Sequence, residues 1–278
     1  MYTILKKQEL SSGVKLFAVN APLIARKCLP GQFVILRIDE DGERIPLTIA
    51  DFDREAGTIT LIFQEVGHST RQLGAMAEGD ALRDLAGPLG KPTHIGHSGT
   101  VVCIGGGIGV APVYPIARAF KQAGNKVISI IGARSTNLLI LELEMAAVSD
   151  VLHIMTDDGS QGSKGFVTTA LKDIIASGEK IDLVMAIGPV IMMRSVADVT
   201  KPHGIPTIVS LNPIMVDGTG MCGGCRVSVA DKNKFACVDG PEFNAHEVDF
   251  EGLMVRQRMY HEQEKLEYAG GGSCKCKR

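Results

Sequence analysis

Residues 100–112 read TVVCIGGGIGVAP, and this stretch decides the fold of the chain. An apolar run typical of a buried parallel strand ends in glycines and passes into a predicted helix at 110–124. Glycines let a backbone approach a pyrophosphate closely, and the helix N-terminus supplies free N–H groups and a positive dipole. The strict G-x-G-x-x-G pattern is not met, because Gly105 and Gly107 fit but Val110 holds the last position. A tight turn without a ligand is therefore the alternative.

Downstream of this stretch, strand patterns alternate with helical patterns up to residue 210. Expected strands cover 126–133, 151–160, 181–189 and 206–211, and expected helices cover 138–149, 165–178 and 190–204. Such alternation predicts an α/β domain with a doubly wound parallel sheet.

Upstream, residues 1–97 contain many short strand patterns. Runs at 13–19, 32–38, 58–63 and 80–90 lie between turn signals rich in glycine and proline. Spacings of about ten residues are typical of an antiparallel barrel. We therefore expect an antiparallel β-barrel before the α/β domain.

The composition excludes several other classes of protein. The net charge is −2 and Trp is absent, which argues against a nucleic-acid surface. No apolar run reaches the ~18 residues of a membrane-spanning helix, and the N-terminus lacks a signal-peptide pattern. We therefore expect a cytoplasmic protein with no membrane partner. In that reducing compartment, the 7 cysteines suit metal ligands or redox groups better than disulfides.

Two further loops follow predicted parallel strands, whose carboxyl ends are where such sheets bind ligands. Residues 156–168 read TDDGSQGSKGFVT and carry two acids in a glycine-rich loop, for which a solvated loop is the alternative. Residues 188–196 read GPVIMMRSV. Met192 and Met193 are placed to line a nicotinamide or adenine pocket, although core packing suits at least one of them.

The barrel region carries a second candidate site, and its first segment is ERIPLTIAD at 43–51. Pro46 interrupts a strand edge and leaves Leu47 and Thr48 extended. An extended backbone of this kind can lie against a flat ring system, with the hydroxyl reaching a ring nitrogen.

The other segment of that site is QEVGHSTRQL at 64–73. Gly67, Ser69 and Thr70 open a predicted helix, whose N-terminus suits a diphosphate. The alternative is that Ser69 is an ordinary N-cap residue.

Residues 216–240, VDGTGMCGGCRVSVADKNKFACVDG, carry three closely spaced cysteines. Plant-type [2Fe-2S] sites use C-x4-C-x2-C and a distant fourth cysteine. Asp217 holds the first position here, so the pattern is D-x4-C-x2-C-x11-C through Cys222, Cys225 and Cys237. Zinc held by thiolates and a carboxylate is the competing interpretation, and buried inert thiols are a third.

The other four cysteines have different predicted roles. Cys28 and Cys103 fall in apolar strand contexts, so we expect them to be packing residues. Cys274 and Cys276 lie in the terminal GGGSCKCKR, where a disordered end is favoured over a metal site.

With these segments in place, nearly all of residues 1–250 resembles the ferredoxin-NADP reductase superfamily, in which a flavin barrel precedes a nicotinamide domain. The GGGIGVAP, TDDGS and GPVIMM segments with a C-terminal cluster loop look like the electron-transfer subunit of class B dihydroorotate dehydrogenase. RIPLTIAD and Asp217 look even more like the small subunit of NADH-dependent reduced ferredoxin:NADP oxidoreductase, also called sulfide dehydrogenase β subunit. The dihydroorotate subunit normally carries a fourth cysteine in place of Asp217.

The resemblance implies three cofactors and their contacts. It implies FAD on Arg44, Pro46, Leu47, Thr48, Gly67, Ser69 and Thr70. It implies NAD(H) on Gly105, Gly106, Gly107, Gly109, Pro112, Asp157, Asp158, Gly188 and Pro189. It implies a [2Fe-2S] cluster on Asp217, Cys222, Cys225 and Cys237. The superfamily arginine stands three residues before the Ser or Thr, where this chain has Ile45, so Arg44 is one place early.

The implied function is that of an NAD(P)H-dependent oxidoreductase subunit. NAD(H) exchanges electrons with FAD, and the [2Fe-2S] cluster passes them singly to a larger flavin and [4Fe-4S] partner. That heterodimer would serve ferredoxin by electron bifurcation. No acid or base side chain is needed for hydride transfer, so no catalytic residue is assigned.

Two alternative functions remain. One is the electron-transfer subunit of dihydroorotate dehydrogenase B. The other is a non-enzymatic redox sensor or a zinc-bearing regulatory module. The resemblance favours NAD(H). Arg134 and Ser135 follow the second strand of the α/β domain, where NADPH is discriminated from NADH, so they are either phosphate-binding residues or part of a solvated loop.

The expected division of the chain has four parts. They are an FAD-binding β-barrel at 1–97, an NAD(P)-binding α/β domain at 98–210, a [2Fe-2S] loop subdomain at 211–250, and a C-terminal helix with a flexible tail at 251–278.

Overall fold

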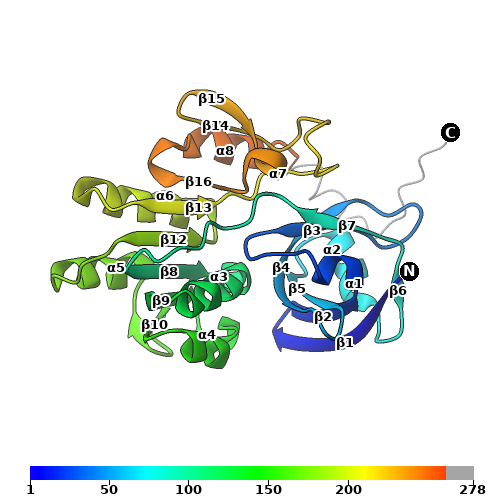
Figure 1. The fold of residues 1–278 in the computed structure, drawn as a ribbon, viewed down its shortest axis with the longest axis horizontal. Helices are drawn as coiled ribbons and strands as arrows, with labels where there is room; N and C mark the ends of the chain where they lie inside the picture. The colour runs from blue at the N-terminus through cyan, green and yellow to red at the C-terminus, as the bar shows by residue number, and fades with distance from the viewer. Residues whose placement is uncertain (261–278) are drawn as a thin grey trace.

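The structure, a computed structural model, describes residues 1–260 of the chain. Within these residues the chain forms two seven-stranded sheets and one two-stranded sheet. The first sheet lies beside the second in Figure 1, and the two-stranded sheet lies above the second. Cys274, Cys276 and the expected tail lie outside the described residues.

The first sheet is a nearly closed antiparallel barrel, which confirms the predicted fold of the N-terminal region. Its strand order is β6-β1-β2-β5-β4-β3-β7. The strands are β1 (Tyr2–Ser11), β2 (Val14–Asn20), β3 (Phe33–Arg37), β4 (Ile45–Asp53), β5 (Thr58–Gln64), β6 (Ala81–Leu82) and β7 (Asp84–Leu89). Two helices, α1 (Pro22–Ala25) and α2 (His68–Ala75), pack on it. Pro46 lies inside β4 opposite Ile35 of β3, so the strand continues through the proline.

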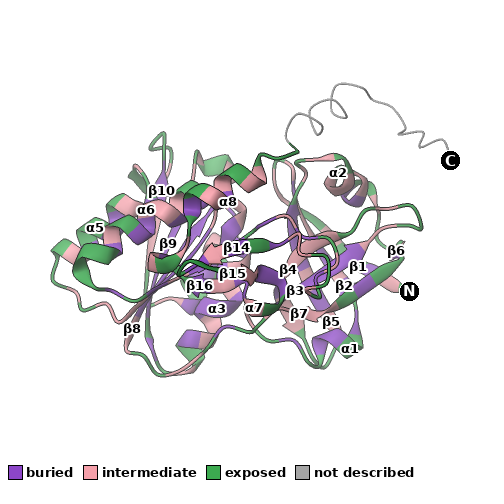
Figure 2. Ribbon diagram, turned by 90° about the horizontal axis from the view of Figure 1, so that it is seen from above, coloured by how far each residue is buried: buried purple, intermediate pink, exposed green. Residues whose placement is uncertain are grey.

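The second sheet is parallel except at one edge, as the alternation of strands and helices predicted. Its strand order is β11-β10-β9-β8-β12-β13-β16. The strands are β8 (Thr100–Gly106), β9 (Lys126–Ala133), β10 (Val151–Thr156), β11 (Ser163–Lys164), β12 (Leu183–Ile187), β13 (Thr207–Ser210) and β16 (Glu242–Asn244). The crossover helices are α3 (Val110–Gln122), α4 (Glu142–Val148), α5 (Val167–Ala176) and α6 (Val190–Thr200). Figure 2 shows buried residues along the central strands of this sheet.

Two predictions about this half of the chain were wrong. The helix expected at 138–149 is shorter, because Leu141 has a left-handed φ of 55° and α4 begins only after it. Residues 211–250, expected to form an irregular loop subdomain, are not irregular throughout. They contain the hairpin β14 (Arg226–Val229) and β15 (Lys232–Phe235), the short helix α7 (Ala236–Asp239) and the edge strand β16, followed by α8 (Phe250–Gln257).

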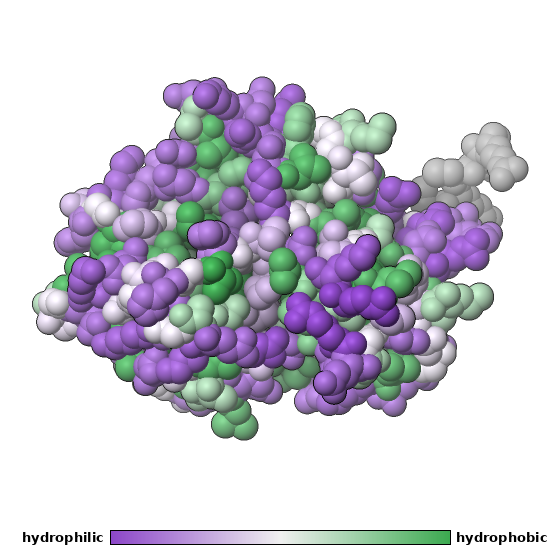
Figure 3. Space-filling view, in the orientation of Figure 1, coloured by the Kyte–Doolittle hydropathy of each residue, from purple (hydrophilic) through white to green (hydrophobic). Residues whose placement is uncertain are grey.

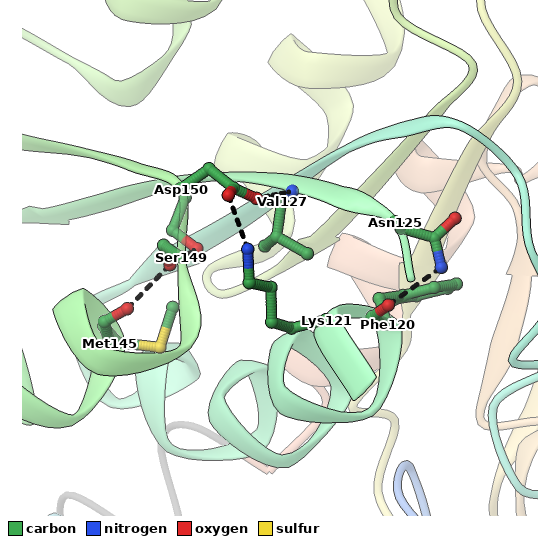
Figure 4. A network of polar contacts seen from close by, with 8 residues as sticks. Phe120, Lys121, Asn125, Val127, Met145, Ser149 and Asp150 are labelled. Atoms are coloured by element: carbon green, nitrogen blue, oxygen red, sulfur yellow. Dashed lines mark hydrogen bonds and ion pairs between the residues drawn. The ribbon is translucent and has the colours of Figure 1, made fainter. Parts of the chain in front are cut away.

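The amino edge of the second sheet is held by polar contacts to the preceding helices. Asp150 forms an ion pair with Lys121 of α3 at 2.5 Å, and its carboxylate accepts a hydrogen bond from the backbone N–H of Val127 at 2.8 Å. Asn125 donates to the carbonyl of Phe120 at 2.8 Å (Figure 4). These contacts fix the edge opposite to the one where parallel sheets bind ligands.

The barrel and the second sheet pack against each other through α3 and β4. Arg118 of α3 forms an ion pair with Asp51 of β4 at 2.5 Å, and Ala50 and Ile62 of the barrel join the apolar core beside α3. The ion pair and the apolar contacts each join segments that lie far apart in sequence. The barrel and the second sheet therefore share one buried interface. No helix among residues 1–260 has both the length and the apolar character required to cross a membrane.

Candidate functional site

Two of the predicted cluster cysteines meet inside the C-terminal lobe. Cys225 ends the glycine-rich loop before β14, and Cys237 is the second residue of α7. Both are buried, with 1% and 2% of their surface exposed. Their Sγ atoms are 3.1 Å apart. Burial raises the pKa of Cys237 to about 12, so binding a metal at this pair must release a proton.

The other two predicted ligands form a second, more exposed pair. The Asp217 carboxylate accepts backbone N–H groups from Thr219 and from Cys222, both at 2.9 Å. The bond from Thr219 is the main reason that the pKa of Asp217 is lowered. The thiol sulfur of Cys222 accepts the N–H of Gly224 at 3.4 Å. The aspartate is therefore held as a carboxylate next to a cysteine, as an iron ligand would have to be.

The four side chains form two pairs and do not converge on one point. Among residues 1–260, no three His, Cys, Asp or Glu side chains are close enough to hold a single metal ion. Zinc needs its ligands in one tetrahedral shell, whereas a two-iron cluster takes two protein ligands on each iron. The arrangement therefore fits a two-iron cluster better than zinc.

The loop that carries Asp217 also packs directly on the barrel. Gly218 has a left-handed φ of 75°, and a Cβ on it would lie 2.7 Å from Cγ1 of Ile35 in β3. Ile35 pairs with Pro46 of β4, the strand predicted to bind FAD. The proposed cluster loop and the proposed flavin strand are thus separated by one strand, a spacing of about 5 Å per strand. Figure 1 shows α7 above β3 and β7 at this junction.

The two barrel segments predicted to bind FAD lie together. Ser69 donates a hydrogen bond to the Glu43 carboxylate, which joins the N-terminus of α2 to the loop before β4. Thr70 accepts the backbone N–H groups of Val66 and Gly67, both at 3.0 Å. The N-cap is Gly67, so the alternative role of Ser69 as N-cap is wrong.

The remaining predicted FAD residues flank this junction. Arg44 is exposed in the loop before β4, whereas Pro46, Leu47 and Thr48 are half-buried along that strand. Leu47 pairs with Val34 of β3. The structure therefore places Arg44 at the solvent side of the segment rather than on the strand.

The glycines predicted to bind NAD(H) lie at the carboxyl ends of two adjacent strands. Gly105 and Gly106 end β8, and Gly107 and Gly109 form the turn into α3. Gly188 follows β12, the neighbour of β8. Pro112 lies in the first turn of α3 and Pro189 precedes α6. Because chain connections leave β8 and β12 in opposite directions, this is the switch point where open α/β sheets bind ligands.

Asp157 and Asp158 lie farther along the same edge, after β10. The backbone N–H of Asp157 bonds to Ala133 at 3.1 Å and that of Asp158 to Arg134 at 3.2 Å. The side chain of Asp158 accepts the hydroxyl of Ser160 at 2.6 Å, which is the main cause of its lowered pKa. Strand β9 separates these residues from the glycines of β8, so they can meet only the far end of a long ligand.

Sequence reasoning missed Glu242, a half-buried residue at the contact between barrel and second sheet. Thr93, in the segment after β7, donates its hydroxyl to Glu242 at 2.6 Å. Gly31 has φ 85°, and a Cβ on it would lie 2.7 Å from the Glu242 carboxylate. The only local signal was an acid directly after the Gly240-Pro241 turn. Burial raises the pKa of Glu242 to about 7.

Glu242→Gln is expected to flatten the dependence of stability on pH. The folded protein keeps this carboxyl protonated to a higher pH than the unfolded chain, whose value is near 4.5. Its contribution to stability is therefore present below pH 4.5 and is lost as the pH rises through about 7. Above that pH the variant should be the more stable protein, by on the order of 3 kcal/mol. Glutamine still accepts the Thr93 hydroxyl.

The measurement is denaturant unfolding of both proteins between pH 5 and pH 8.5. The exposed Glu247, five residues later, supplies the matched control Glu247→Gln. Parallel stability curves for wild type and Glu242→Gln across this range would contradict the assignment of Glu242.

A barrel followed by a doubly wound sheet is the architecture of ferredoxin reductase-like electron-transfer flavoproteins. Residues 103–198 match the family of oxidoreductase NAD-binding domains, and residues 212–249 match the iron-sulfur cluster binding domain of dihydroorotate dehydrogenase B. Phthalate dioxygenase reductase, at 17% identity and a TM-score of 0.57 over 82% of this chain and 85% of that one, shares the fold.

The chain belongs to the family of dihydroorotate dehydrogenase B electron transfer subunits and their homologues. It is 48% identical over 265 residues to the electron transfer subunit homolog of Thermotoga maritima, covering 95% of this chain and 93% of the relative. It is 33% identical to the electron transfer subunit of Bacillus caldolyticus, covering 83% and 90%. A chain in the structure of an NADH-dependent reduced ferredoxin-NADP oxidoreductase, solved to study flavin-based electron bifurcation, matches with 46% identity and a TM-score of 0.92 over 97% of each chain. These matches confirm the predicted resemblance.

Proposed function

We propose that this chain is the NAD(H)-linked electron-transfer subunit of an electron-bifurcating ferredoxin:NADP oxidoreductase. It would bind FAD in residues 1–97, NAD(H) in residues 98–210 and a [2Fe-2S] cluster in residues 211–250. The observation that carries the proposal is the two-pair ligand set of Asp217 with Cys222 and Cys225 with Cys237, packed one strand away from β4. When bound, the flavin exchanges electron pairs with NAD(H) and the cluster exchanges single electrons.

The residues of the chain set the order of these exchanges. The glycines at β8 and β12 would hold the dinucleotide at the switch point, on the side of the sheet that meets the barrel. The short helix η1 (Gly107–Gly109) lies against β5 of the barrel. Pro46, Leu47 and Thr48 would support the flavin ring, and β3 then leads to the cluster loop at Gly218. Electrons therefore have a short route from sheet to barrel to loop.

The surface around the cluster loop supports a protein partner. Exposed apolar side chains lie on the cluster loop and on the segments beside it: Val216, Met221, Val238, Met259 and Tyr260. Figure 3 shows weakly polar and apolar atoms over this part of the molecule, where the loop runs in Figure 1. Exposed apolar surface of this kind marks docking sites. We assign the larger flavin and [4Fe-4S] subunit to this surface, forming a heterodimer in which ferredoxin reacts at the partner.

Anaerobic purification with the native partner tests the proposal. We expect one FAD and one two-iron cluster on this chain by flavin, iron and acid-labile sulfide quantitation, and a visible spectrum of flavin bands above broad iron–sulfur absorption. The chain alone should oxidise NADH with artificial acceptors but carry out no ferredoxin reaction. Bifurcation by the isolated chain would disprove the partner assignment, and a colourless protein with stoichiometric zinc would disprove the cofactors.

The second candidate function is electron transfer to a dihydroorotate dehydrogenase, which the relatives at 33% identity favour by name. Asp217 in place of a cysteine favours the first candidate. The chain that co-purifies decides between them, because the dihydroorotate enzyme would give dihydroorotate-dependent reduction of NAD⁺ in the same preparation.

A further inference from the structure

Met192 lies over the two glycine turns at the switch point of the second sheet. It is the third residue of α6, and its backbone N–H bonds to the carbonyl of Pro189 at 2.9 Å. A Cβ on Gly106 would lie 2.3 Å from the Sδ of Met192, and a Cβ on Gly188 would lie 2.8 Å from its Cε. One thioether therefore covers both turns, and in this position it leaves no room for a Cβ at either of them.

The next residue has a different environment. Met193 is completely buried in the core between α5, α6 and the sheet, whereas Met192 is only half-buried. Met192 packs only partly against this core, and its thioether reaches out to the two glycine turns. Of the two adjacent methionines, Met193 is a core residue, whereas Met192 extends over the glycine turns.

The orientation of a dinucleotide at this edge follows from the barrel contact. The turn at Gly107–Gly109 lies against β5 of the barrel, and the loop with Asp157 and Asp158 lies beyond β9, away from β12. The redox-active end of the ligand must approach the flavin, so it belongs on the β8 and β12 side, under Met192. The adenosine end then extends toward β10.

We infer that Met192 is a positioning residue for the nicotinamide end of NAD(H). Its side chain moves off Gly106 and Gly188 when the dinucleotide binds and then packs on the nicotinamide ring. Methionine suits this role because its unbranched side chain has three rotatable bonds and a thioether that packs well on aromatic rings. Gly106 and Gly188 let the ligand take the place of the thioether, because a backbone without side chains can be approached closely once the thioether has moved. This inference rests on the proposed binding of NAD(H) at this edge.

Limited oxidation by hydrogen peroxide, with and without saturating NAD⁺, tests the inference on the full chain carrying its cofactors. NAD⁺ is used because it leaves the flavin oxidised. Sulfoxide formation is followed at each methionine by peptide mass spectrometry. Met192 should be oxidised about fivefold more slowly with NAD⁺, because susceptibility follows exposure. Met221, with 89% of its surface exposed, should react equally in both samples, and buried Met193 should react slowly in both.

Met192 and Met193 fall in the same peptide, so a Met192→Leu variant is needed to show which of them forms the sulfoxide. The protected sulfoxide must disappear in this variant while the slow reaction at Met193 stays. Calorimetric titration with NAD⁺ is run on the same preparation. Binding of NAD⁺ without protection of Met192, or with faster oxidation of it, overturns the inference alone. Absence of NAD⁺ binding overturns it together with the proposed function.

Discussion

Asp217→Ala is expected to lose most of its iron and acid-labile sulfide, whereas Asp217→Cys keeps a full cluster at a lower reduction potential. Alanine leaves one iron with Cys222 as its only protein ligand, so that iron is held weakly. Cysteine restores a fourth thiolate, a softer and more strongly donating ligand than a carboxylate. We expect a potential shift on the order of 100 mV, since replacing ligands in two-iron centres moves potentials by hundreds of millivolts.

The same carboxylate also orders the loop, so the two roles must be separated. Asp217→Asn keeps an oxygen that can accept the N–H groups of Thr219 and Cys222 but is a poor ligand for iron. It should resemble Asp217→Ala in iron content while keeping the native stability. Two variants serve as controls for iron content. Cys225→Ala should lose the cluster completely, and Cys28→Ala, at a buried cysteine of the barrel, should lose none of it. An unchanged paramagnetic resonance signal and potential in Asp217→Ala would exclude the aspartate as a ligand.

The parts of the fold that the sequence predicted are those with strong local patterns. Strand β9 was predicted at its observed limits, and β8, α3 and α6 were predicted closely, because each is an apolar run bounded by glycine or a helix stop. Cys28 proved to be buried, as expected, but it follows α1 and is not in a strand. Asp217, Cys222, Cys225 and Cys237 could be proposed as ligands from the sequence alone because their spacing is a local pattern.

The missed features depend on contacts between distant segments. Strands β15 and β16 are 4 and 3 residues long, too short to show a pattern, and β16 forms only because β13 lies beside it. Glu242 and Thr93 are 149 residues apart, and Ser69 and Glu43 are 26 apart. No local rule pairs such residues. The tertiary structure also decides which of the two adjacent methionines is fully buried.

Gly109→Ala is expected to lower both the stability of the protein and its NAD⁺ affinity. A Cβ on Gly109 would lie 2.2 Å from the carbonyl oxygen of Ile187 and 2.8 Å from Cα of Gly188. Both neighbours are backbone atoms, so α3 must move away from the end of β12. We expect about 3 kcal/mol of destabilisation and a loss of about tenfold or more in NAD⁺ affinity, which corresponds to about 1.4 kcal/mol.

Gly107→Ala is the matched control, two residues earlier in the same turn. Gly107 has φ 55°, and a Cβ there would meet no protein atom within 4 Å. The left-handed backbone costs alanine about 1–2 kcal/mol, but nothing in the fold has to move. Because a proposed dinucleotide would approach this open side, Gly107→Ala should weaken NAD⁺ binding without the larger loss of stability. Denaturant unfolding and NAD⁺ calorimetry on both variants separate the two glycines: Gly109 holds the switch point together, and Gly107 leaves room for the ligand. Equal NAD⁺ affinity in Gly107→Ala and wild type would show that the dinucleotide does not pass over this turn.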